Sequence, residues 1–416
     1  MRIRNLIILS ILLILAFGCS QKKAESLEGH WRATWETTAG EVPVDMTLKS
    51  DEAGSLQVLF HNADEIVKFD RVEKEGQDIK MYLDRYECVI AATISEDGKS
   101  MEGNWSKNTG GPNSTAFKAV KGDIPRFPEN TYPPLEGEPV YLDISGEWKF
   151  RFQDDEFDGI AYFEQEGDHL TATIRTAIGD LRYLEGIYRN GRLCFSCFNG
   201  SWVFIFKAEL DEDGVFNGQW ARGMRPPVPW KAAKGEPDFP DPWSLSKITS
   251  QDGSFRFSYP LAENPDKIIT ESDPLLKGKP FILALTMTGC PNSHDSADVL
   301  SKLYHDYHEK GLNIVCVMTE IRNDISLIQK RCQRFAEEHD LPAIYVYSLA
   351  MSKKEMTEEL PDLERLYAWP TAVFIGGDEK VVAIHTGMDG PGTGIFYNQL
   401  MERYRKTVEE MLVKEN

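Results

Sequence analysis

The amino-acid sequence predicts an α+β multidomain protein, in which duplicated antiparallel β barrel or sandwich units are followed by an α/β sandwich. Three observations lead to this fold class. At 416 residues the chain is too long for one ordinary hydrophobic core, so two or three domains are expected. The first half consists of short alternating segments that recur. The composition then changes at residues 240–243, and from there buried strands alternate with helical patterns.

The N-terminal residues predict export and a lipid anchor. Arg2 and Arg4 precede an apolar run from Leu6 to Phe17, which is too short for a membrane span and has the positive flank of an export signal. The small residue before Cys19 resembles a bacterial lipobox, so we expect cleavage after residue 18 and lipid on Cys19. The alternative is a plain signal peptide with an incidental cysteine. The expected location is the bacterial cell envelope, with the lipid-anchored chain facing the periplasm.

A β unit is repeated in the first half of the chain, at offsets of 112 to 117 residues. The matched strings are Gly29-His30-Trp31 with Gly146-Glu147-Trp148, Glu96-Asp97-Gly98 with Glu212-Asp213-Gly214, Gly103-Asn104-Trp105 with Gly218-Gln219-Trp220, Lys118 to Gly122 with Lys231 to Gly235, and Pro125 to Pro128 with Pro237 to Pro240. This pattern predicts a tandem duplication. Each copy is expected to form a small barrel or sandwich, although both copies could instead close one larger barrel.

The repeat boundaries and the proline-rich stretches predict how the chain is divided. The expected parts are a signal peptide at 1–18, a lipidated tether at 19–26, β repeat 1 at 27–122, a linker at 123–143, β repeat 2 at 144–235, a second linker at 236–250 and the α/β unit at 251–416. The recurring tryptophans are expected in the cores of the repeats, because Trp at matched positions of two copies is more often core than a stacking surface for sugars.

Charge and cysteine content exclude some functions. The formal net charge of −20 argues against a nucleic-acid partner, which would need clustered Lys and Arg. No spacing dictates how the six later cysteines, Cys88, Cys194, Cys197, Cys290, Cys316 and Cys332, would pair. Cys194 and Cys197 lie in a strand-like segment, where residues three apart point to opposite faces, so buried packing is favoured over a redox or metal role.

The C-terminal part predicts a βαβ unit followed by ββα, with helices on both faces of the sheet. The expected strands are 255–259, 279–285, 312–318, 343–347, 371–375 and 381–385, and the expected helices are 293–310, 324–339, 353–367 and 394–412.

One cysteine of this part has the placement that activates a thiol. Cys290 follows the strand at 279–285 and precedes a helix whose first turn suits Pro291. Unpaired backbone N–H groups and the helix dipole stabilise a thiolate there. The hydroxyls of Thr286, Thr288 and Ser293 are candidate hydrogen-bond donors to the sulfur. Because the early acidic residues Asp295 and Asp298 oppose this effect, we expect a moderately lowered pKa of the thiol.

Residues 255–412 resemble the thioredoxin-like module of TlpA-type disulfide reductases and related AhpC/TSA-like redoxins. The resemblance is carried by Gly289-Cys290-Pro291-Asn292, the helix after it, Gly311 to Val317, and Trp369-Pro370-Thr371 before a strand. It implies that Pro370 is cis and faces the active cysteine, where the neighbouring backbone pairs with a substrate chain. It makes Cys290, Ser293 and Pro370 the candidate catalytic residues, with Trp369 and Thr371 as accessories.

The sequence departs from this family at the second cysteine of the motif, which is Ser293. Without a thiol there, Cys290 can form a mixed disulfide but cannot release it within the motif. An external thiol, Cys316, Cys332 or oxidation of Cys290 by peroxide could complete a cycle, but buried packing is favoured for Cys316 and Cys332. Met287 stands where peroxiredoxins of this superfamily usually carry Thr.

His294 and Thr288 are further accessory candidates, and a solvated helix face is favoured over a metal site for His305 and His308. We expect no cofactor and no metal. The predicted function is thiol–disulfide exchange on exported proteins, with Cys290 as a monothiol nucleophile, Ser293 as hydrogen-bond donor to its thiolate and an external thiol as partner. The alternative is a non-catalytic binding or scaffold lipoprotein, with a degenerate redox fold and ligand-binding β repeats.

Overall fold

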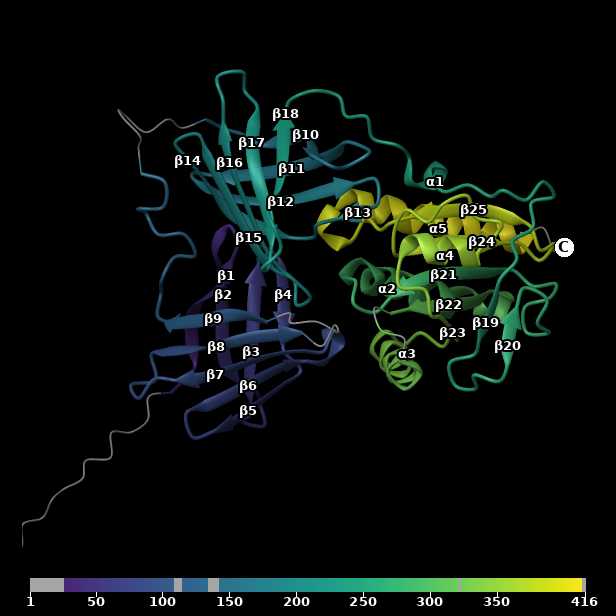
Figure 1. The fold of residues 1–416 in the computed structure, drawn as a ribbon, viewed down its shortest axis with the longest axis horizontal. Helices are drawn as coiled ribbons and strands as arrows, with labels where there is room; N and C mark the ends of the chain where they lie inside the picture. The colour runs from purple at the N-terminus through teal and green to yellow at the C-terminus, as the bar shows by residue number, and fades with distance from the viewer. Residues whose placement is uncertain (1–25, 108–113, 134–141, 321, 323, 414–416) are drawn as a thin grey trace, which may run out of the picture.

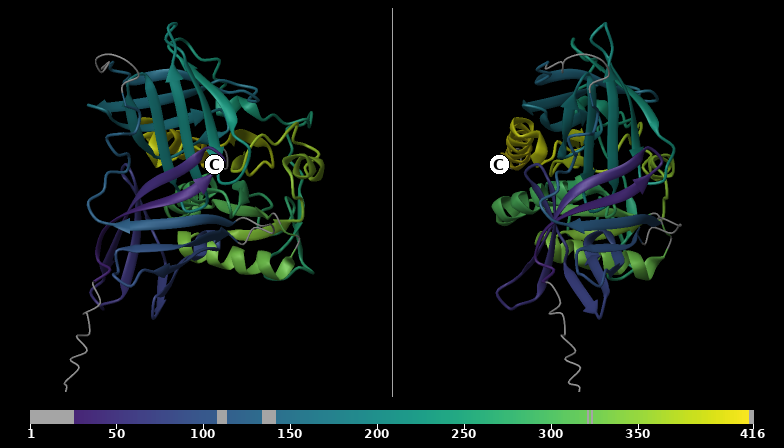
Figure 2. Two further views of the ribbon diagram at one scale, coloured as in Figure 1. Left: turned by 60° about the vertical axis from the view of Figure 1, so that its left-hand side comes forward. Right: turned by 90° about the vertical axis from the view of Figure 1, so that its left-hand side faces the viewer.

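The computed structural model describes residues 26–107, 114–133, 142–320, 322 and 324–413. The signal peptide and the lipidation candidate Cys19 lie outside these residues. The described chain forms two β units and a C-terminal α/β unit, and both β units lie along one flank of the α/β unit (Figure 1). The turned views show the same arrangement (Figure 2). None of the described helices is both long enough and apolar enough to span a bilayer.

The first β unit is a nine-stranded antiparallel half-barrel in the order β4-β3-β2-β1-β9-β8-β7-β6-β5. Its strands alternate buried and exposed side chains, as expected for a sheet with one solvated face. The strands are β1 (Gly29–Thr37), β2 (Gly40–Ser50), β3 (Leu56–Asn62), β4 (Glu65–Lys68), β5 (Arg71–Glu75), β6 (Asp78–Leu83), β7 (Cys88–Ile94), β8 (Ser100–Lys107) and β9 (Ser114–Lys121), with the short 3-10 helix η1 (Asp84–Tyr86) before β7.

The second β unit is a closed barrel in the order β11-β10-β18-β17-β16-β15-β14-β12-β13, because β11 also pairs with β12. An aromatic core that includes Trp148, Phe150 and Phe216 fills its interior. Its strands are β10 (Gly146–Phe152), β11 (Gly159–Glu166), β12 (His169–Thr176), β13 (Gly179–Asp180), β14 (Leu184–Arg189), β15 (Arg192–Phe198), β16 (Val203–Leu210), β17 (Phe216–Arg222) and β18 (Val228–Ala233).

The half-barrel is completed by the outer wall of the barrel. Phe198 of β15 stacks on Trp35 at 4.7 Å between ring centroids and meets Phe60 edge-on at 5.0 Å. Other outward-facing barrel residues, including Ile187 and Ile205, belong to the same buried cluster as the inner face of the half-barrel. The two units therefore share one apolar interface, whose formation removes from water the concave face that an open sheet would expose.

The matched sequence strings lie at corresponding places of the two sheets. β1 pairs with β9 as β10 pairs with β18, and Trp105 and Trp220 lie in β8 and β17. The alternative of one larger barrel closed by both copies is wrong, because each copy has its own sheet. Trp31, Trp105 and Trp148 are buried as expected, whereas Trp220 is only partly buried. The duplication itself stays a prediction.

Cys194 and Cys197 confirm the expectation that residues three apart on a strand face opposite ways. Cys194 packs in the cluster between the two β units, and Cys197 packs inside the barrel. Both are free, buried thiols. Buried packing is therefore the role that the geometry gives this pair.

The C-terminal unit contains a five-stranded sheet in the order β23-β22-β21-β24-β25. Strands β21, β22 and β23 are parallel, whereas β24 is antiparallel to both of its neighbours. Its elements are α1 (Pro242–Leu245), β19 (Ser258–Pro260), β20 (Ile268–Thr270), β21 (Phe281–Met287), α2 (Pro291–Tyr307), η2 (His308–Lys310), β22 (Asn313–Thr319), α3 (Ile325–His339), β23 (Ile344–Ser348), α4 (Lys353–Glu359), β24 (Thr371–Ile375), β25 (Val381–Thr386), η3 (Pro391–Thr393) and α5 (Ile395–Val413).

Helices cover both faces of this sheet, as predicted. Two successive right-handed crossovers in the same direction put α2 and α3 on one face, where α5 joins them. On the opposite face pack α4 and the segment of residues 255–276. Two predicted elements are shorter than expected. The helix expected at 353–367 ends at Glu359, before Pro361, and the strand expected at 255–259 begins only at Ser258.

Candidate functional site

The backbone around Cys290 has the predicted strand-to-helix geometry. Strand β21 is buried over most of its length, and Cys290 is the N-cap residue of α2 in an extended conformation. Pro291 occupies the first helical turn, where a missing N–H costs no helical hydrogen bond. The Cys290 backbone N–H donates to the Met287 carbonyl at 3.0 Å. This turn holds the thiol at the start of the helix.

The thiol faces the loop that precedes β24. Cys290 Sγ donates to the Trp369 carbonyl at 3.6 Å, and the Trp369–Pro370 peptide bond is cis, as the family resemblance implies. The loop is held by two further hydrogen bonds: Thr371 Oγ1 donates to the Ala368 carbonyl at 2.8 Å, and the Gly387 N–H donates to the Pro370 carbonyl at 2.8 Å. The structure thus brings Cys290 and the 368–371 loop together, although they are about 80 residues apart in sequence.

The expected lowering of the thiol pKa is wrong. Burial is the largest influence on Cys290 and raises its pKa, and the Asp295 carboxylate acts in the same direction. Hydrogen bonds from the Ser293 and Asn292 backbone and from the Ser293 side chain favour the thiolate, but they do not outweigh burial. The helix N-terminus was read correctly from the sequence. The burial of the thiol in the folded protein has no local signal in the sequence.

Ser293 is buried within one turn of Cys290, and its Oγ accepts a hydrogen bond from the Met287 N–H at 3.3 Å. The two threonines expected to donate to the sulfur do not do so. Thr286 Oγ1 donates to the Ala284 carbonyl at 3.4 Å, and Thr288 Oγ1 donates to the Glu320 carboxylate. Both hydroxyls are buried, so they take the acceptors nearest to them in the fold.

The His294 side chain bonds to groups other than the Cys290 thiol. Its Nε2 lies 2.8 Å from the Thr288 carbonyl and its Nδ1 lies 2.7 Å from His339 Nε2. Burial lowers the pKa of His294 well below its ordinary value. Among the described residues it makes no hydrogen bond or ion pair with Cys290, so its geometry offers no general base to the thiol.

The first β unit and the barrel together cover Gly289, the residue before the cysteine. Ser201 Oγ donates to the Gly289 carbonyl at 2.9 Å, and Lys107 Nζ lies 2.5 Å from Ser201 Oγ and 3.5 Å from the same carbonyl. Burial lowers the pKa of Lys107 to about 8, while Cys88 and Cys290 act in the opposite direction. A small cavity beside Gly289 is lined mainly by charged side chains, among them Arg85, Glu87, Glu320, Arg322 and Arg331.

The barrel also touches the first turn of α2. Asn292 Nδ2 donates to the Asp180 carbonyl at 3.3 Å. A Cβ on Gly179, whose φ is +132°, would lie 2.4 Å from Asn292 Nδ2. The left-handed backbone and this close approach therefore both require glycine at position 179. The Asp180 side chain is buried beside Asp295, and burial raises its pKa to about 8.

Buried ion pairs fasten the β units to the α/β unit. Arg175 of β12 forms a bidentate pair with Asp389 at 2.7 and 2.8 Å, and Arg331 of α3 forms one with Glu87 at 3.0 and 2.6 Å. Arg182 joins all three units, because it bonds both Glu65 and Asp295. Planar guanidinium groups suit such bidentate contacts. Apart from Asp295, these residues were not singled out from the sequence, and no spacing relates partners more than 100 residues apart.

The remaining cysteines do not form a redox pair with Cys290 in this structure. All six described cysteines are free thiols. Cys316 lies in β22 and Cys332 in α3, both in one buried cluster. Burial raises the pKa of Cys332 to about 12 and that of Cys316 further. Among the described cysteines, Cys290 alone is not classed as fully buried, which fits a packing role for the other five.

Comparisons with known proteins show distant structural likeness only. No protein-family model and no curated protein matches the chain. Similar solved structures include a thiol:disulfide interchange protein of the thioredoxin family from Chlorobium tepidum TLS, with 12% identity, coverage of 38% of this chain and 95% of that chain, and a TM-score of 0.29. A thiol-disulfide oxidoreductase from Bacteroides fragilis NCTC 9343 matches with 14% identity, coverage of 35% and 96%, and a TM-score of 0.27.

A third similar structure is a secreted Mycobacterium tuberculosis disulfide oxidoreductase homologous to E. coli DsbE. It has 16% identity, covers 35% of this chain and 92% of that chain, and gives a TM-score of 0.25. At these scores the matches carry no argument about activity. What this chain can do must be argued from its own residues around Cys290.

Proposed function

We propose that this protein is a lipid-anchored envelope protein whose C-terminal unit carries out monothiol exchange with disulfides of exported proteins. The observation that carries the proposal is the position of Cys290 Sγ, at the N-terminus of α2 and 3.6 Å from the carbonyl that precedes Pro370. A partner chain that displaces this contact would find an exposed backbone carbonyl next to the thiol. Cys290, Ser293 and Pro370 are then the working residues, with Trp369 and Thr371 shaping the loop.

The exchange proceeds in two steps. The Cys290 thiolate attacks one sulfur of a substrate disulfide, a mixed disulfide forms, and the second substrate sulfur leaves as a thiolate. Ser293 cannot resolve this adduct, so an external thiolate must attack it. If the attack falls on the substrate sulfur, Cys290 leaves as the thiolate. If it falls on the Cys290 sulfur, the substrate leaves as a thiolate and Cys290 stays joined to the external thiol, which a second external thiolate must displace. Within this proposal Ser293 donates a hydrogen bond to the Cys290 thiolate before it attacks and again when it leaves.

Exchange also requires movement of the β units, because Ser201 and Lys107 cover the Gly289 carbonyl. In the covered arrangement the raised pKa of Cys290 keeps the sulfur protonated at neutral pH and therefore a poor nucleophile. Uncovering the thiol removes the burial that raises its pKa. The helix N-terminus and the hydrogen bonds from residue 293 would then favour the thiolate.

Ser293→Cys tests the proposal. The variant places a second thiol one turn from Cys290, and we expect it to create or raise insulin-reducing activity. The matched control is the double variant Cys290→Ser/Ser293→Cys, which keeps a thiol at position 293 and should be inactive. If Ser293→Cys gains no activity over the parent protein, the assignment of this motif as a redox site is wrong.

The contacts of Ser201 and Lys107 with the Gly289 carbonyl also favour a second function. A thiol with a raised pKa, next to a Gly289 carbonyl that two other units cover, is also what a binding or scaffold protein with a retained redox fold would show. Trapping in cells separates the two functions. Recurrent mixed-disulfide partners on Cys290, lost in Cys290→Ser, would support exchange, whereas recovery of Cys290 as a free thiol without partners would support binding.

The proposed location rests on the N-terminal sequence. The positive flank at Arg2 and Arg4, the short apolar run and Cys19 support export and lipidation. Metabolic labelling with a fatty-acid analogue should mark the wild-type protein and not Cys19→Ser. Unchanged labelling of Cys19→Ser would contradict lipidation at this residue.

A further inference from the structure

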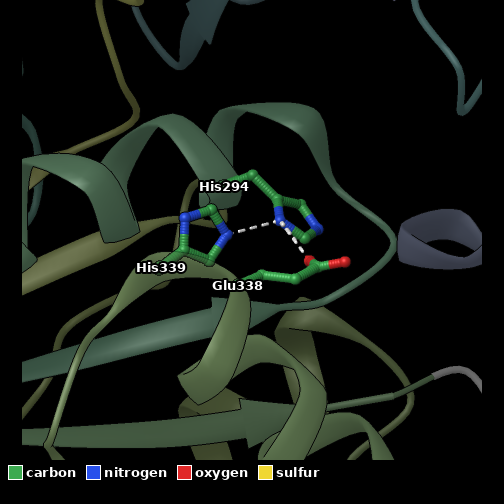
Figure 3. A group of neighbouring side chains, drawn as sticks. All are labelled: His294, Glu338 and His339. Atoms are coloured by element: carbon green, nitrogen blue, oxygen red, sulfur yellow. Dashed lines mark hydrogen bonds and ion pairs between the residues drawn. The ribbon is translucent and has the colours of Figure 1, made fainter. Parts of the chain in front are cut away.

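Two histidines and a glutamate meet where the first turn of α2 lies against the end of α3 (Figure 3). The nearest ligand atoms of His294, His339 and Glu338 all lie within 4.8 Å of one another. His294 comes from α2, whereas Glu338 and His339 are consecutive near the C-terminus of α3. The three side chains are far apart in sequence and come from two helices, so only the fold assembles them.

The outer nitrogen of each imidazole already has a hydrogen-bond acceptor. His294 Nε2 lies 2.8 Å from the Thr288 carbonyl, and His339 Nδ1 lies 2.6 Å from the Asp298 carboxylate. Both acceptors require an N–H on the ring nitrogen that faces them. Neutral rings in these tautomers would direct the lone pairs of His294 Nδ1 and His339 Nε2 toward each other.

Those two inner nitrogens are 2.7 Å apart, with a hydrogen bond between them. With an N–H on each outer nitrogen, a hydrogen bond between the inner nitrogens would need one more proton and would make one of the two buried rings cationic. A metal ion bound between the two inner nitrogens would accept both of their lone pairs. Metal-bound histidines characteristically donate their second N–H to a carbonyl or a carboxylate, and both arrangements occur here. Because zinc–nitrogen bonds are about 2.0–2.1 Å long, the two nitrogens would separate by roughly half an ångström to admit the ion.

Glu338 provides a negatively charged third ligand from the solvent side. Its carboxylate lies 4.0 Å from His294 Nδ1, and its side chain is 22% exposed while both histidines are buried. The centroid of the Phe335 ring lies 5.0 Å from that of His294 and 4.7 Å from that of His339. The Tyr86 ring meets the His294 ring edge-on, with 5.1 Å between the ring centroids. The site therefore combines aromatic neighbours with one partly exposed side, where Glu338 pairs with Arg85.

We propose that His294, His339 and Glu338 form a binding site for a divalent transition-metal ion, with Zn²⁺ as the ion that suits two imidazoles and one carboxylate. A water molecule would complete a four-coordinate ion. Bound metal would fix the first turn of α2, four residues after Cys290, to the end of α3. The surface histidines His305 and His308 take no part in the site. The proposal does not depend on the redox function of Cys290.

One residue of the first β unit competes with the ion. Arg85 Nε lies 3.4 Å from Glu338 Oε2, and the Arg85 side chain is 39% exposed. Such a partly exposed ion pair contributes about 0–1 kcal/mol. Metal binding would break it, so removing Arg85 should strengthen metal binding by up to about fivefold, since 1.4 kcal/mol corresponds to a factor of ten.

The test is a titration of the full mature chain, without a histidine tag, with Zn²⁺ against a competing chelating dye, repeated with Co²⁺ to record visible absorption. The expected result is one saturable site per chain and the absorption bands of four-coordinate Co²⁺. His339→Gln and Glu338→Gln should each weaken binding at least tenfold. Asp298→Asn, which removes only the carboxylate behind His339, should weaken it about 10- to 100-fold.

Two further variants separate this site from adventitious binding. His305→Ala removes a surface histidine of the same helix and should leave the affinity unchanged, while Arg85→Ala should raise it. Glu338 and Asp298 are exposed enough for their variants to fold even where His339→Gln does not. Absence of a saturable site in the wild type would overturn the proposal. Equal affinity of wild type, Glu338→Gln and Asp298→Asn would also overturn it.

Discussion

The β units contact Gly289 and Asn292 on either side of the Cys290–Pro291 pair, so we expect the reactivity of Cys290 to depend on interface contacts far from the thiol. The sharpest perturbation is Arg175→Ala. Arg175 and Asp389 form a bidentate pair between the barrel and the α/β unit, and each side chain is only about one tenth exposed, at 10% and 12%. Arg175 also lies over the Phe396 ring at 3.6 Å. Its removal leaves the Asp389 carboxylate at a buried interface without its counter-charge.

Breaking a buried ion pair from one side costs about 3–5 kcal/mol. If alkylation of Cys290 requires separation of the barrel from α2, a loss of about 3 kcal/mol in the docked state increases the open population by roughly 100-fold, because 1.4 kcal/mol is a factor of ten. The alkylation rate of Cys290 should rise by that factor. The assay follows the modified peptide by mass spectrometry over time at neutral pH, with buried Cys316 and Cys332 as internal references.

Arg365→Ala is the matched control. Arg365 also joins the α/β unit to the barrel, through Glu156 at 3.0 Å, but both side chains are more than half exposed, at 55% and 53%. An exposed pair contributes about 0–1 kcal/mol, so the rate should rise no more than about fivefold. Equal rates for the two variants, with Cys316 and Cys332 still protected, would refute the idea that buried pairs hold the cover in place. Wild-type Cys290 reacting as fast as a free thiol would refute the cover itself.

Two predictions concern pH. The raised pKa of Cys290 predicts that its alkylation rate keeps rising with pH above about 8.5, the ordinary thiol value, and a plateau near pH 7 would contradict this. Asp180, with a folded-state pKa of about 8 against about 3.9 when unfolded, favours the folded form at low pH; this stability is lost as pH rises toward 8. Asp180→Asn should therefore raise the thermal midpoint at pH 7.5 and flatten its decline between pH 4 and 8, as scanning calorimetry would show.

Local pattern predicted much of the secondary structure. Helix α3 begins at Ile325 with Asp324 as its cap and ends at His339, within one residue of the sequence expectation, because a capping side chain and an amphipathic period mark both ends locally. The helix expected at 353–367 was wrong beyond Glu359. Leu360, Leu363 and Leu366 have helical spacing, but they pack as buried parts of an irregular segment against the sheet. Apolar spacing alone does not distinguish a helix from a buried irregular segment. Tertiary packing decided the conformation of this stretch.

In the candidate site too, some features follow from local sequence and others depend on tertiary contacts. The turn from β21 into α2 was predictable, because Cys290 and Pro291 stand between a buried strand and a helix. The pKa of the thiol was not predictable, since burial in the folded protein decides its direction and no local pattern gives the extent of that burial. Lys107 and Ser201 carry no local signal at all. Lys107 ends strand β8 and Ser201 lies in the turn between β15 and β16, and each acquires its role only by lying beside Gly289.

The sequence by itself determined the elements, the order of the β and α/β parts and the position of the one cysteine that begins a helix. These features depend on hydrophobic period, capping and turn residues, which act over a few positions. The tertiary structure alone decided that one β unit is a closed barrel and the other a half-barrel resting on it. It also decided that both β units contact the residues beside Cys290, and that His294 meets His339 and Glu338. Such juxtapositions arise when surfaces distant in sequence pack to remove apolar area from water, and no local pattern records which surfaces will meet.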